Sequence, residues 1–256
     1  KSNGIKYFYD FKIQGNTEFS KGTLVLSLEN GKSQLSFIKP NGDVQARIYE
    51  SINLKPLPDN PLSIHYMTNK FTGNTPLGYW IISKNGGVRL NVNNLVQEEL
   101  KPGTLEDNFF LAPNPLEVGS LQMTPNGVLM GVINGKFYGG TTNTWDQANT
   151  YGMFGSYADG DYELHNNFIL TNVNDNLSMI AFEKNKKQFL RLNNYGSPMY
   201  FGTQYSVMVT DIFDPMNLGL DLLHMVQINN TDTYAYAKDQ AGVVYELKFN
   251  VNFNGP

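Results

Sequence analysis

Thr23–Ile38 reads TLVLSLENGKSQLSFI, and its pattern sets the class of fold. Apolar residues alternate with polar ones on both sides of Asn30-Gly31, which is the period of two typical of half-buried strands. An Asn-Gly pair tolerates the positive φ that both central positions of a type I′ turn require. The stretch therefore predicts a β-hairpin.

The same layout recurs four more times along the chain. An alternating run, a tight polar turn and a second run are found in Leu77–Val92, Gly127–Thr142, Leu177–Leu192 and Thr233–Phe249. Their predicted turns are Asn85-Gly86, Asn134-Gly135, Asn185-Lys186 and Gln240 to Gly242. Turns that recur roughly every 50 residues match the length of a four-stranded antiparallel unit, as in kelch-type repeats.

Shorter apolar runs between the hairpins supply further strands. Those expected are Val44–Ser51, Leu62–Thr68, Asn108–Ala112, Gly119–Thr124, Tyr151–Ser156, Tyr162–Thr171, Met199–Phe201, Tyr205–Val209 and Leu222–Ile228. One short helix is a candidate over Asn93–Leu100, where an Asn cap precedes an apolar stripe that Pro102-Gly103 ends. The chain is therefore expected to be almost entirely β.

Stacking four-stranded sheets around an axis buries the faces that one sheet alone leaves open. The sequence thus predicts an all-β fold, a β-propeller of about five four-stranded blades in a single repeat domain. The alternatives are a larger ring that is truncated here and an irregular β-sandwich. The expected strand Ile5–Ile13 either closes the ring on the last blade or ends a preceding domain. Expected blades are 16–74, 75–125, 126–174, 175–230 and 231–256, the last completed by 5–13.

The composition of the 256 residues fits this fold. Charged residues make up only 16%, aromatic residues make up 13%, and Asn is the most frequent residue. Proteins with many turns and half-buried strands have this composition, whereas helical bundles, coiled coils and disordered tails do not.

Charge and cysteine content exclude several functional classes. A net charge of -4 and a pI of about 5.4 disfavour nucleic acid as the main ligand. No apolar run approaches the roughly 20 residues that span a bilayer. Without Cys there is no disulfide, thiolate metal site or Cys nucleophile. Because the sequence begins at Lys1 with no apolar signal region, we expect a mature or trimmed chain. A monomer is the expected oligomeric state.

Three stretches carry a resemblance to a known family. Gly22–Ile38, the NGDV of residues 41–44 and Leu57–Leu62 (LPDNPL) resemble the PKD-like lipoproteins of gut Bacteroidetes, and Tyr234–Phe249 also fits. The resemblance covers the repeat region and not the immunoglobulin-like modules, which would lie upstream of Lys1. It implies an exported protein of the outer-membrane surface or periplasm, encoded near glycan-uptake systems. It carries over no catalytic residues, and it implies an anchoring Cys upstream.

Motifs for catalysis or metal binding are weak. His65 and His224 lie in apolar runs and are expected to be ordinary strand histidines, and His165 is the most polar of the three. None has the spacing of a metal site, and no nucleophile elbow or nucleotide-binding glycine motif occurs. We therefore expect no metal and no cofactor.

A local carboxylate cluster stands next to His165. Asp159, Asp161 and Glu163 resemble the start of a calcium loop, but the Gly and the closing Glu of that loop are missing. Strand alternation would place Asp161 and Glu163 on one face. The simpler interpretation is a solvated hairpin turn.

A glycoside hydrolase or lyase of the propeller type is the catalytic alternative. It needs two carboxylates within about 5–10 Å of each other. The acids available for such a pair are Asp10, Asp43, Asp107, Asp146, Asp161, Glu163 and Asp211. No glycosidase signature surrounds them, so this alternative rests on fold analogy alone.

A binding role has the better support in the sequence. Gly139–Asp161 is a long polar stretch that carries several aromatic residues, and Trp145 either meets a ligand there or packs under its own loop. Aromatic faces and planar polar groups are what sugars need. Trp80, in contrast, lies mid-strand and is expected in the core. The expected ligand-binding residues are Trp145, Asp146, Gln147, Asn149, Tyr151, Tyr157, Asp159 and Asp161.

The sequence therefore predicts a non-catalytic binding module of an exported surface lipoprotein. It would capture a glycan, or contact an outer-membrane uptake complex, in polysaccharide utilization. The competing hypotheses are the propeller-type hydrolase or lyase and a scaffold for protein–protein interaction.

Overall fold

Nearly all regular structure in the described residues is β-strand. The computed structural model describes residues 18–69, 73–99, 102–125, 127–141, 152–173, 176–193, 199–200, 213–229 and 232–249. The only exceptions there are the helix α1 (Ile48–Asn53) and the 3-10 turn η2 (Glu106–Asn108). In chain order the strands are β1 (Thr23–Glu29), β2 (Lys32–Ile38), β3 (Val44–Gln45), β4 (Pro61–Asn69), β5 (Thr75–Ser83), β6 (Gly86–Leu90), β7 (Val118–Met123), β8 (Leu129–Ile133), β9 (Lys136–Gly139), β10 (Ile169–Val173), β11 (Asn176–Glu183), β12 (Gln188–Asn193), β13 (Met199–Tyr200), β14 (Asp221–Gln227), β15 (Thr233–Lys238) and β16 (Val244–Phe249).

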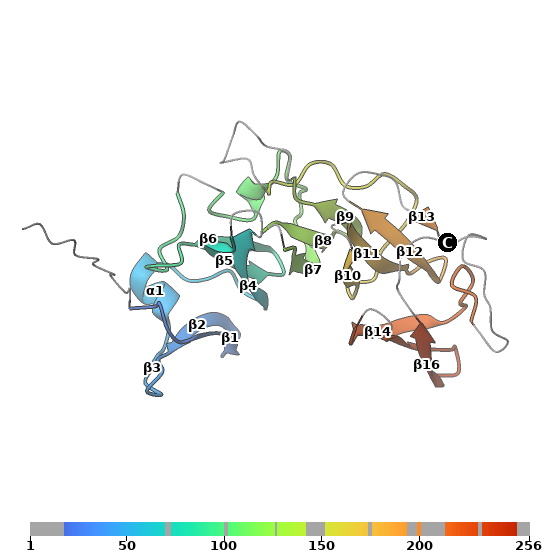
Figure 1. The fold of residues 1–256 in the computed structure, drawn as a ribbon, viewed down its shortest axis with the longest axis horizontal. Helices are drawn as coiled ribbons and strands as arrows, with labels where there is room; N and C mark the ends of the chain where they lie inside the picture. The colour runs from blue at the N-terminus through green and yellow to red at the C-terminus, as the bar shows by residue number, and fades with distance from the viewer. Residues whose placement is uncertain are drawn as a thin grey trace, which may run out of the picture.

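These strands form five antiparallel sheets, each made of strands that follow one another in the chain. Sheet 1 is β1–β3, sheet 2 is β4–β6, sheet 3 is β7–β9, sheet 4 is β10–β13 and sheet 5 is β14–β16. They follow one another along an arc from the blue sheet 1 to the red sheet 5 (Figure 1). The all-β class is thus confirmed. Sheet 4 has the expected four strands, and the others have three in the part of the chain described.

All five predicted hairpins are present. They are β1–β2, β5–β6, β8–β9, β11–β12 and β15–β16. In the first, Asn30 and Gly31 both have positive φ, at 49° and 79°. In the third, Asn134 and Gly135 do the same, at 50° and 69°. Both turns therefore meet the backbone requirement that made Asn-Gly a hairpin signal.

The turn of the second hairpin is one residue earlier than predicted. Ser83 pairs with Gly86, so Lys84 and Asn85 form the turn and Gly86 begins the next strand. Gly86 has a φ of 144°, and a Cβ at this position would lie 2.7 Å from Glu106 Oε1. The positive φ and the nearby Glu106 side chain both favour glycine at this strand position, which lies outside the turn itself. The fourth and fifth hairpins have the longer loops 184–187 and 239–243.

Four of the five hairpins are extended by the strand that precedes them, whereas β1–β2 is extended by β3, which follows it. β4 pairs with β5, β7 with β8, β10 with β11 and β14 with β15. The strands expected at 62–68, 119–124 and 222–228 therefore join the hairpin that follows them, and not the hairpin before. The strand expected over 5–13 lies outside the described residues.

The segment predicted as a strand over Val44–Ser51 is a strand only in its first two residues, and its second half is helical. β3 ends at Gln45, Arg47 takes a left-handed conformation with φ 53°, and α1 follows. Adjacent Ile48 and Tyr49 are both buried, which a strand with one buried face does not allow. Packing of these two side chains into the core decides the local structure.

Other sequence expectations for short elements were wrong. The helix expected from Asn93 is absent over 93–99, where Asn91 and Asn94 side chains accept hydrogen bonds from the backbone N–H groups of Asn93 and Val96. Such side-chain bonds compete with a helix. The strands expected at 108–112 and 151–156 are reduced, in the described residues, to bridges that involve Phe109 and Phe154.

The core lies between consecutive sheets. One hydrophobic cluster fills each of the four junctions, and their main members are Leu35 and Ile81 for sheets 1 and 2, Trp80 and Leu129 for sheets 2 and 3, Val132 and Met179 for sheets 3 and 4, and Phe182 and Met225 for sheets 4 and 5. Trp80 is 2% exposed, which confirms its predicted core position. Contacts between successive sheets also join β1 to β4, β4 to β7, and β10 to β14. In the described chain, no helix is long and apolar enough to cross a bilayer.

Candidate functional site

The turns of the first four hairpins lie at one end of the sheets, which we call the turn face. The second, third and fourth of these turns are each tied by a backbone hydrogen bond to the start of the next sheet or to the segment that leads into it. The N–H of Val118 donates to Lys84 O at 2.7 Å, that of Leu164 to Gly135 O at 2.9 Å, and that of Leu218 to Lys187 O at 3.1 Å. The repeated hairpins are therefore assembled into one continuous surface.

A row of ion pairs follows the same turns. A lysine at each of three turns meets an acid just before or at the first strand of the next sheet: Lys32 with Asp59 at 2.9 Å, Lys84 with Glu117 at 3.1 Å, and Lys187 with Asp221 at 2.8 Å. Most of these side chains are substantially exposed, so each pair contributes only about 0–1 kcal/mol to stability. Their main effect is to place charged groups at fixed positions on the turn face.

A recess of about 650 Å³ opens on this face, and we call it the turn-face recess. Its volume lies within the range of about 300–1,000 Å³ typical of small-molecule sites. Sheets 2, 3 and 4 all contribute to its lining, which consists of Leu62, Lys84, Pro115, Glu117, Val118, Gly119, Asn134, Gly135, Glu163, Asn166 and Lys184.

Hydrogen bonds fix the polar side chains on one side of the recess. Asn134 Nδ2 donates to Pro115 O at 2.8 Å, and Asn134 Oδ1 accepts from the N–H of Glu117 at 2.7 Å. The Asn134 amide thereby holds the segment that carries Glu117 next to Lys84. The turn asparagine acts as a brace for the recess as well as a turn former.

Glu163 and Lys184 form an ion pair on the other side. The hydrogen bond and charge of Lys184 lower the pKa of Glu163. This carboxylate is therefore held in its ionised form. A general acid in glycoside hydrolysis needs the opposite, a carboxyl group whose pKa is raised.

Asn166 completes the recess through a close approach to the backbone. A Cβ at Gly119 would lie 2.3 Å from Asn166 Oδ1, so a larger residue at 119 would displace this amide from its present position. The Asn166 side chain is exposed and has no hydrogen-bond partner among the described residues. Its donors and acceptor are available to a ligand.

Five of the predicted site residues, Trp145, Asp146, Gln147, Asn149 and Tyr151, lie outside the described residues. The three others, Tyr157, Asp159 and Asp161, belong to a segment that packs beside the third and fourth turns. Asp161 pairs with Lys186 at 3.1 Å, and Asp159 is exposed. These residues are near the turn face, but they do not line the recess.

Lys136 holds this segment in place. Its Nζ donates to Tyr162 O at 2.7 Å and to Gly160 O at 3.2 Å, and it lies over the rings of Tyr162 and Tyr157 at 4.4 and 5.7 Å. Burial raises the pKa of Tyr162 to about 12. Tyr157 remains 43% exposed and presents part of its ring to solvent. Asp161 and Glu163 both face lysines of the β11–β12 turn, although their segment is not a strand.

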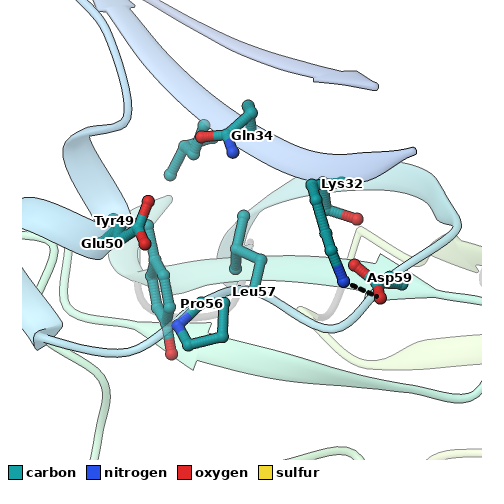
Figure 2. A pocket seen from close by; sticks show the side chains of 9 residues that line it. Lys32, Gln34, Tyr49, Glu50, Pro56, Leu57 and Asp59 are labelled. Carbon is teal, nitrogen blue, oxygen red and sulfur yellow. Dashed lines mark hydrogen bonds and ion pairs between the residues drawn. The ribbon is translucent and has the colours of Figure 1, made fainter. Parts of the chain in front are cut away.

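A second pocket of about 250 Å³ lies between β2, α1 and the segment before β4 (Figure 2), and we call it the helix pocket. The core residues Leu35 and Leu57 lie behind it, and the exposed Pro56 contributes apolar surface. Lys32 and Asp59 meet on one side of it, and Tyr49 and Glu50 lie on the other (Figure 2). Ser33 also lines it, and Tyr49 Oη donates to Gln97 Oε1 at 2.8 Å.

An aromatic cleft of about 310 Å³ separates sheets 1 and 2. Tyr66 and Tyr79 lie side by side there, with ring centroids 5.2 Å apart, and Phe19 and Phe37 meet edge to face. Burial raises the pKa of Tyr79, with a smaller contribution from Tyr66. No charged or amide side chain of the described residues lines the cleft, so it offers less for a polar ligand than the turn-face recess or the helix pocket.

The histidines do not gather into a site. His65 lies in β4 with Nε2 2.8 Å from Ser63 Oγ, and His224 lies in β14, so both are strand residues as expected. The Nδ1 of His165 accepts from the N–H of Asn167 at 3.1 Å, and burial lowers the pKa of His165. No group of three metal-ligating side chains forms in the part of the chain described here.

Comparisons with known proteins give no family. No protein-family model matches the chain, and no curated protein matches it. Matching solved structures include virginiamycin B lyase from Staphylococcus aureus, with 12% identity over 89% of this chain and 70% of that chain and a TM-score of 0.46. A streptogramin B lyase has 12% identity over 90% and 69%, with a TM-score of 0.44. BBS1N in complex with ARL6DN has 11% identity over 92% and 69%, with a TM-score of 0.47. TM-scores below 0.5 carry no argument, so the site is interpreted from its own geometry.

Sequence reasoning missed most of the recess. Lys84, Glu117, Asn166 and Lys184 were not candidates, and Glu163 was considered only as an acid. The available signal was the repeat itself, because residues at matching turns of successive units are brought to one face. Asn134 was recognised, but as a turn former.

Proposed function

We propose that the protein is a non-catalytic binding module that takes a neutral glycan in the turn-face recess. The observation that carries this proposal is the lining of the recess, where two lysines, two glutamates and two asparagine amides from three sheets surround a volume of about 650 Å³. Sugar hydroxyls donate and accept hydrogen bonds at once, and such a mixed set of groups satisfies both roles.

The charge of the recess favours a neutral ligand over an acidic one. Lys84 is paired with Glu117 and Lys184 with Glu163, so the formal charges cancel. An anionic polysaccharide would meet two carboxylates as well as the two lysines, and the chain as a whole carries a net charge of -4. A neutral sugar brings no such repulsion.

We also propose a β-propeller arrangement for the sheets and an exported setting for the protein. The serial order of five antiparallel sheets along an arc, with cores between neighbours, supports the propeller (Figure 1). The exported lipoprotein setting, near a glycan-uptake system, rests on the sequence resemblance. An outer-membrane uptake complex would then be the partner that receives the glycan.

Hydrolase activity is the less favoured function for the same recess. Glu117 and Glu163 supply two carboxylates, but Lys184 lowers the pKa of Glu163, which works against a role as proton donor. The other acids considered from the sequence and described here, Asp43, Asp107 and Asp161, do not line the recess.

The proposal is tested with a glycan array on the wild-type protein and a Lys84→Ala/Asn166→Ala variant. The control is Lys187→Ala, which removes a turn-face lysine that does not line the recess. We expect the wild type and the control to bind the same neutral glycans and the double variant to lose them. Circular dichroism confirms that each variant is folded.

Two results would overturn the proposal. One is silence of the folded wild type across the array, and the other is undiminished binding by the folded double variant. Incubation of bound glycans with the wild type, followed by analysis for shorter products, tests the hydrolase alternative. A Trp145→Ala variant separates the loop prediction from the recess, because the recess alone should keep binding in that variant.

A further inference from the structure

The helix pocket and the turn-face recess are both lined by residues of one short piece of chain, the segment 59–62. Asp59 lines the first and Leu62 lines the second. We propose that the two form one extended site and that the ligand is a chain of several neutral sugar units, not a single sugar. This inference rests on the proposed function and deepens it, since it assigns a second subsite and a minimum ligand length.

The dividing segment is firmly held. Pro58 O accepts hydrogen bonds from Ser33 Oγ at 2.6 Å and from Ser83 Oγ at 3.0 Å, and Asn60 O accepts from the N–H of Lys84 at 2.9 Å. Lys84 therefore has two roles: its backbone N–H holds the segment 58–60, and its side chain lines the recess. The two pockets therefore keep a constant separation.

The separation suits a polymer. From Asp59 to Leu62 the chain advances three residues, which is at most about 10 Å for extended backbone. A single sugar ring is too short to contact both pockets across such a distance. A glycan chain that crosses the segment 59–62 contacts both pockets.

The helix pocket has the groups that a sugar ring needs. The exposed Pro56 gives it apolar surface above the buried Leu57, while Gln34 and Glu50 bring an amide and a carboxylate to it (Figure 2). Neither of these two side chains has a hydrogen-bond partner among the described residues. Apolar surface beside unpartnered planar polar groups matches the apolar C–H face and the hydroxyls of a sugar.

Charge again selects a neutral chain. Lys32 is paired with Asp59 at 2.9 Å, which leaves Glu50 as the unpaired charge of the helix pocket. Because the charges of the recess cancel, the extended site as a whole carries a small net negative charge. A uronic-acid polymer would be repelled at the helix pocket, whereas a neutral chain is accepted there.

The test measures affinity against ligand length by isothermal titration calorimetry. The probes are gluco-, xylo- and manno-oligosaccharides from the monosaccharide to the hexasaccharide, with oligogalacturonate as the acidic comparison. Proteins are the wild type, a Gln34→Ala/Glu50→Ala variant and the control Gln240→Ala, whose side chain is exposed and lies outside both pockets. Oligogalacturonate binding as tight as that of the neutral chains would contradict the charge argument.

For the wild type and the control we expect affinity to rise about tenfold or more from the disaccharide to the hexasaccharide. In the Gln34→Ala/Glu50→Ala variant this gain should be lost, while affinity for the shortest ligands stays the same. A gain that persists unchanged in this folded variant overturns the extended site and leaves the proposed function intact. If the wild type binds no oligosaccharide in the series and no glycan on the array, the proposed function itself fails.

Discussion

Ser33 and Ser83 lie on neighbouring sheets and donate hydrogen bonds to the same carbonyl oxygen. Ser33 Oγ is 2.6 Å and Ser83 Oγ is 3.0 Å from Pro58 O. Both serines are buried, at 4% and 0% exposure. Pro58 thus joins sheets 1 and 2 next to Asp59, which lines the helix pocket.

This shared acceptor predicts non-additive effects on stability. Ser33→Ala or Ser83→Ala alone should lower the free energy of unfolding by about 1 kcal/mol, because Pro58 O keeps one donor. The double variant should lose more than the sum, because the carbonyl is then left without a side-chain donor. Urea denaturation measures each value, and Ser27→Ala, an exposed serine of β1, is the control. Additive losses would show that the two bonds act independently.

The hairpins were predictable because their signal is local. Alternation around Asn30 and Asn134 fixes both the strands and the turn within a few residues, and all five hairpins are present. Other choices depend on distant residues. Gly86 begins β6 with the Glu106 side chain close to its backbone, and Ile48 and Tyr49 of α1 are buried in the core between sheets 1 and 2. No local pattern contains that information.

The candidate site was less predictable for the same reason. Lys84, Glu117 and Lys184 are ordinary polar residues in three separate repeats, and only the assembled sheets bring them to one recess. The long aromatic loop drew attention because its composition is unusual. Of its residues, Tyr157 and Asp161 lie beside the third and fourth turns without lining the recess, and Trp145 lies outside the described residues.

Because of His65, we expect the folded protein to lose stability in mild acid. Burial lowers the pKa of His65 to about 4, and a bond to the Leu121 backbone opposes this only in part. The unfolded chain has the ordinary histidine value near 6.5, so it binds more protons than the folded state between these values. The contribution is fully present above pH 6.5 and is lost as the pH falls from 6.5 to 4, by about 1–3 kcal/mol.

Unfolding in urea at pH 7.5 and pH 4.5 tests this expectation. A His65→Gln variant should lose less stability between the two pH values than the wild type does. Part of the dependence should remain, since burial also lowers the pKa of His165. An identical pH dependence in the two proteins would show that His65 does not titrate as expected.

Replacement of Gly131 in β8 by a larger residue should cause a strong steric clash. Its φ is 152°, and a Cβ would lie 2.2 Å from Ser120 O on the neighbouring strand. Gly131→Ala should therefore cost several kcal/mol, because backbone cannot move aside as a flexible side chain does. Gly42→Ala is the matched control, with φ 91° and no atom within 4 Å, and it should cost only about 1–2 kcal/mol. Comparable thermal midpoints for the two variants would contradict the steric explanation.

Glu183 connects the fourth turn to the recess, and its removal should loosen both. The side chain is 1% exposed and accepts from three backbone N–H groups, those of Glu163 at 3.0 Å, Asn185 at 3.1 Å and Lys186. In Glu183→Gln an NH₂ group replaces one acceptor and faces a backbone donor. We expect a loss of about 1–3 kcal/mol in urea unfolding.

The same substitution at Glu50, which is exposed and has no hydrogen-bond partner among the described residues, should change stability by less than about 0.5 kcal/mol. Hydrogen exchange locates the effect of Glu183→Gln. The Asn185 and Lys186 amides of the turn and the Glu163 amide at the recess should exchange faster, while amides of sheet 1 remain protected. Faster exchange throughout the molecule would mean that Glu183 supports the whole fold and not this junction, because the three amides it binds belong to the fourth turn and to the segment leading into sheet 4.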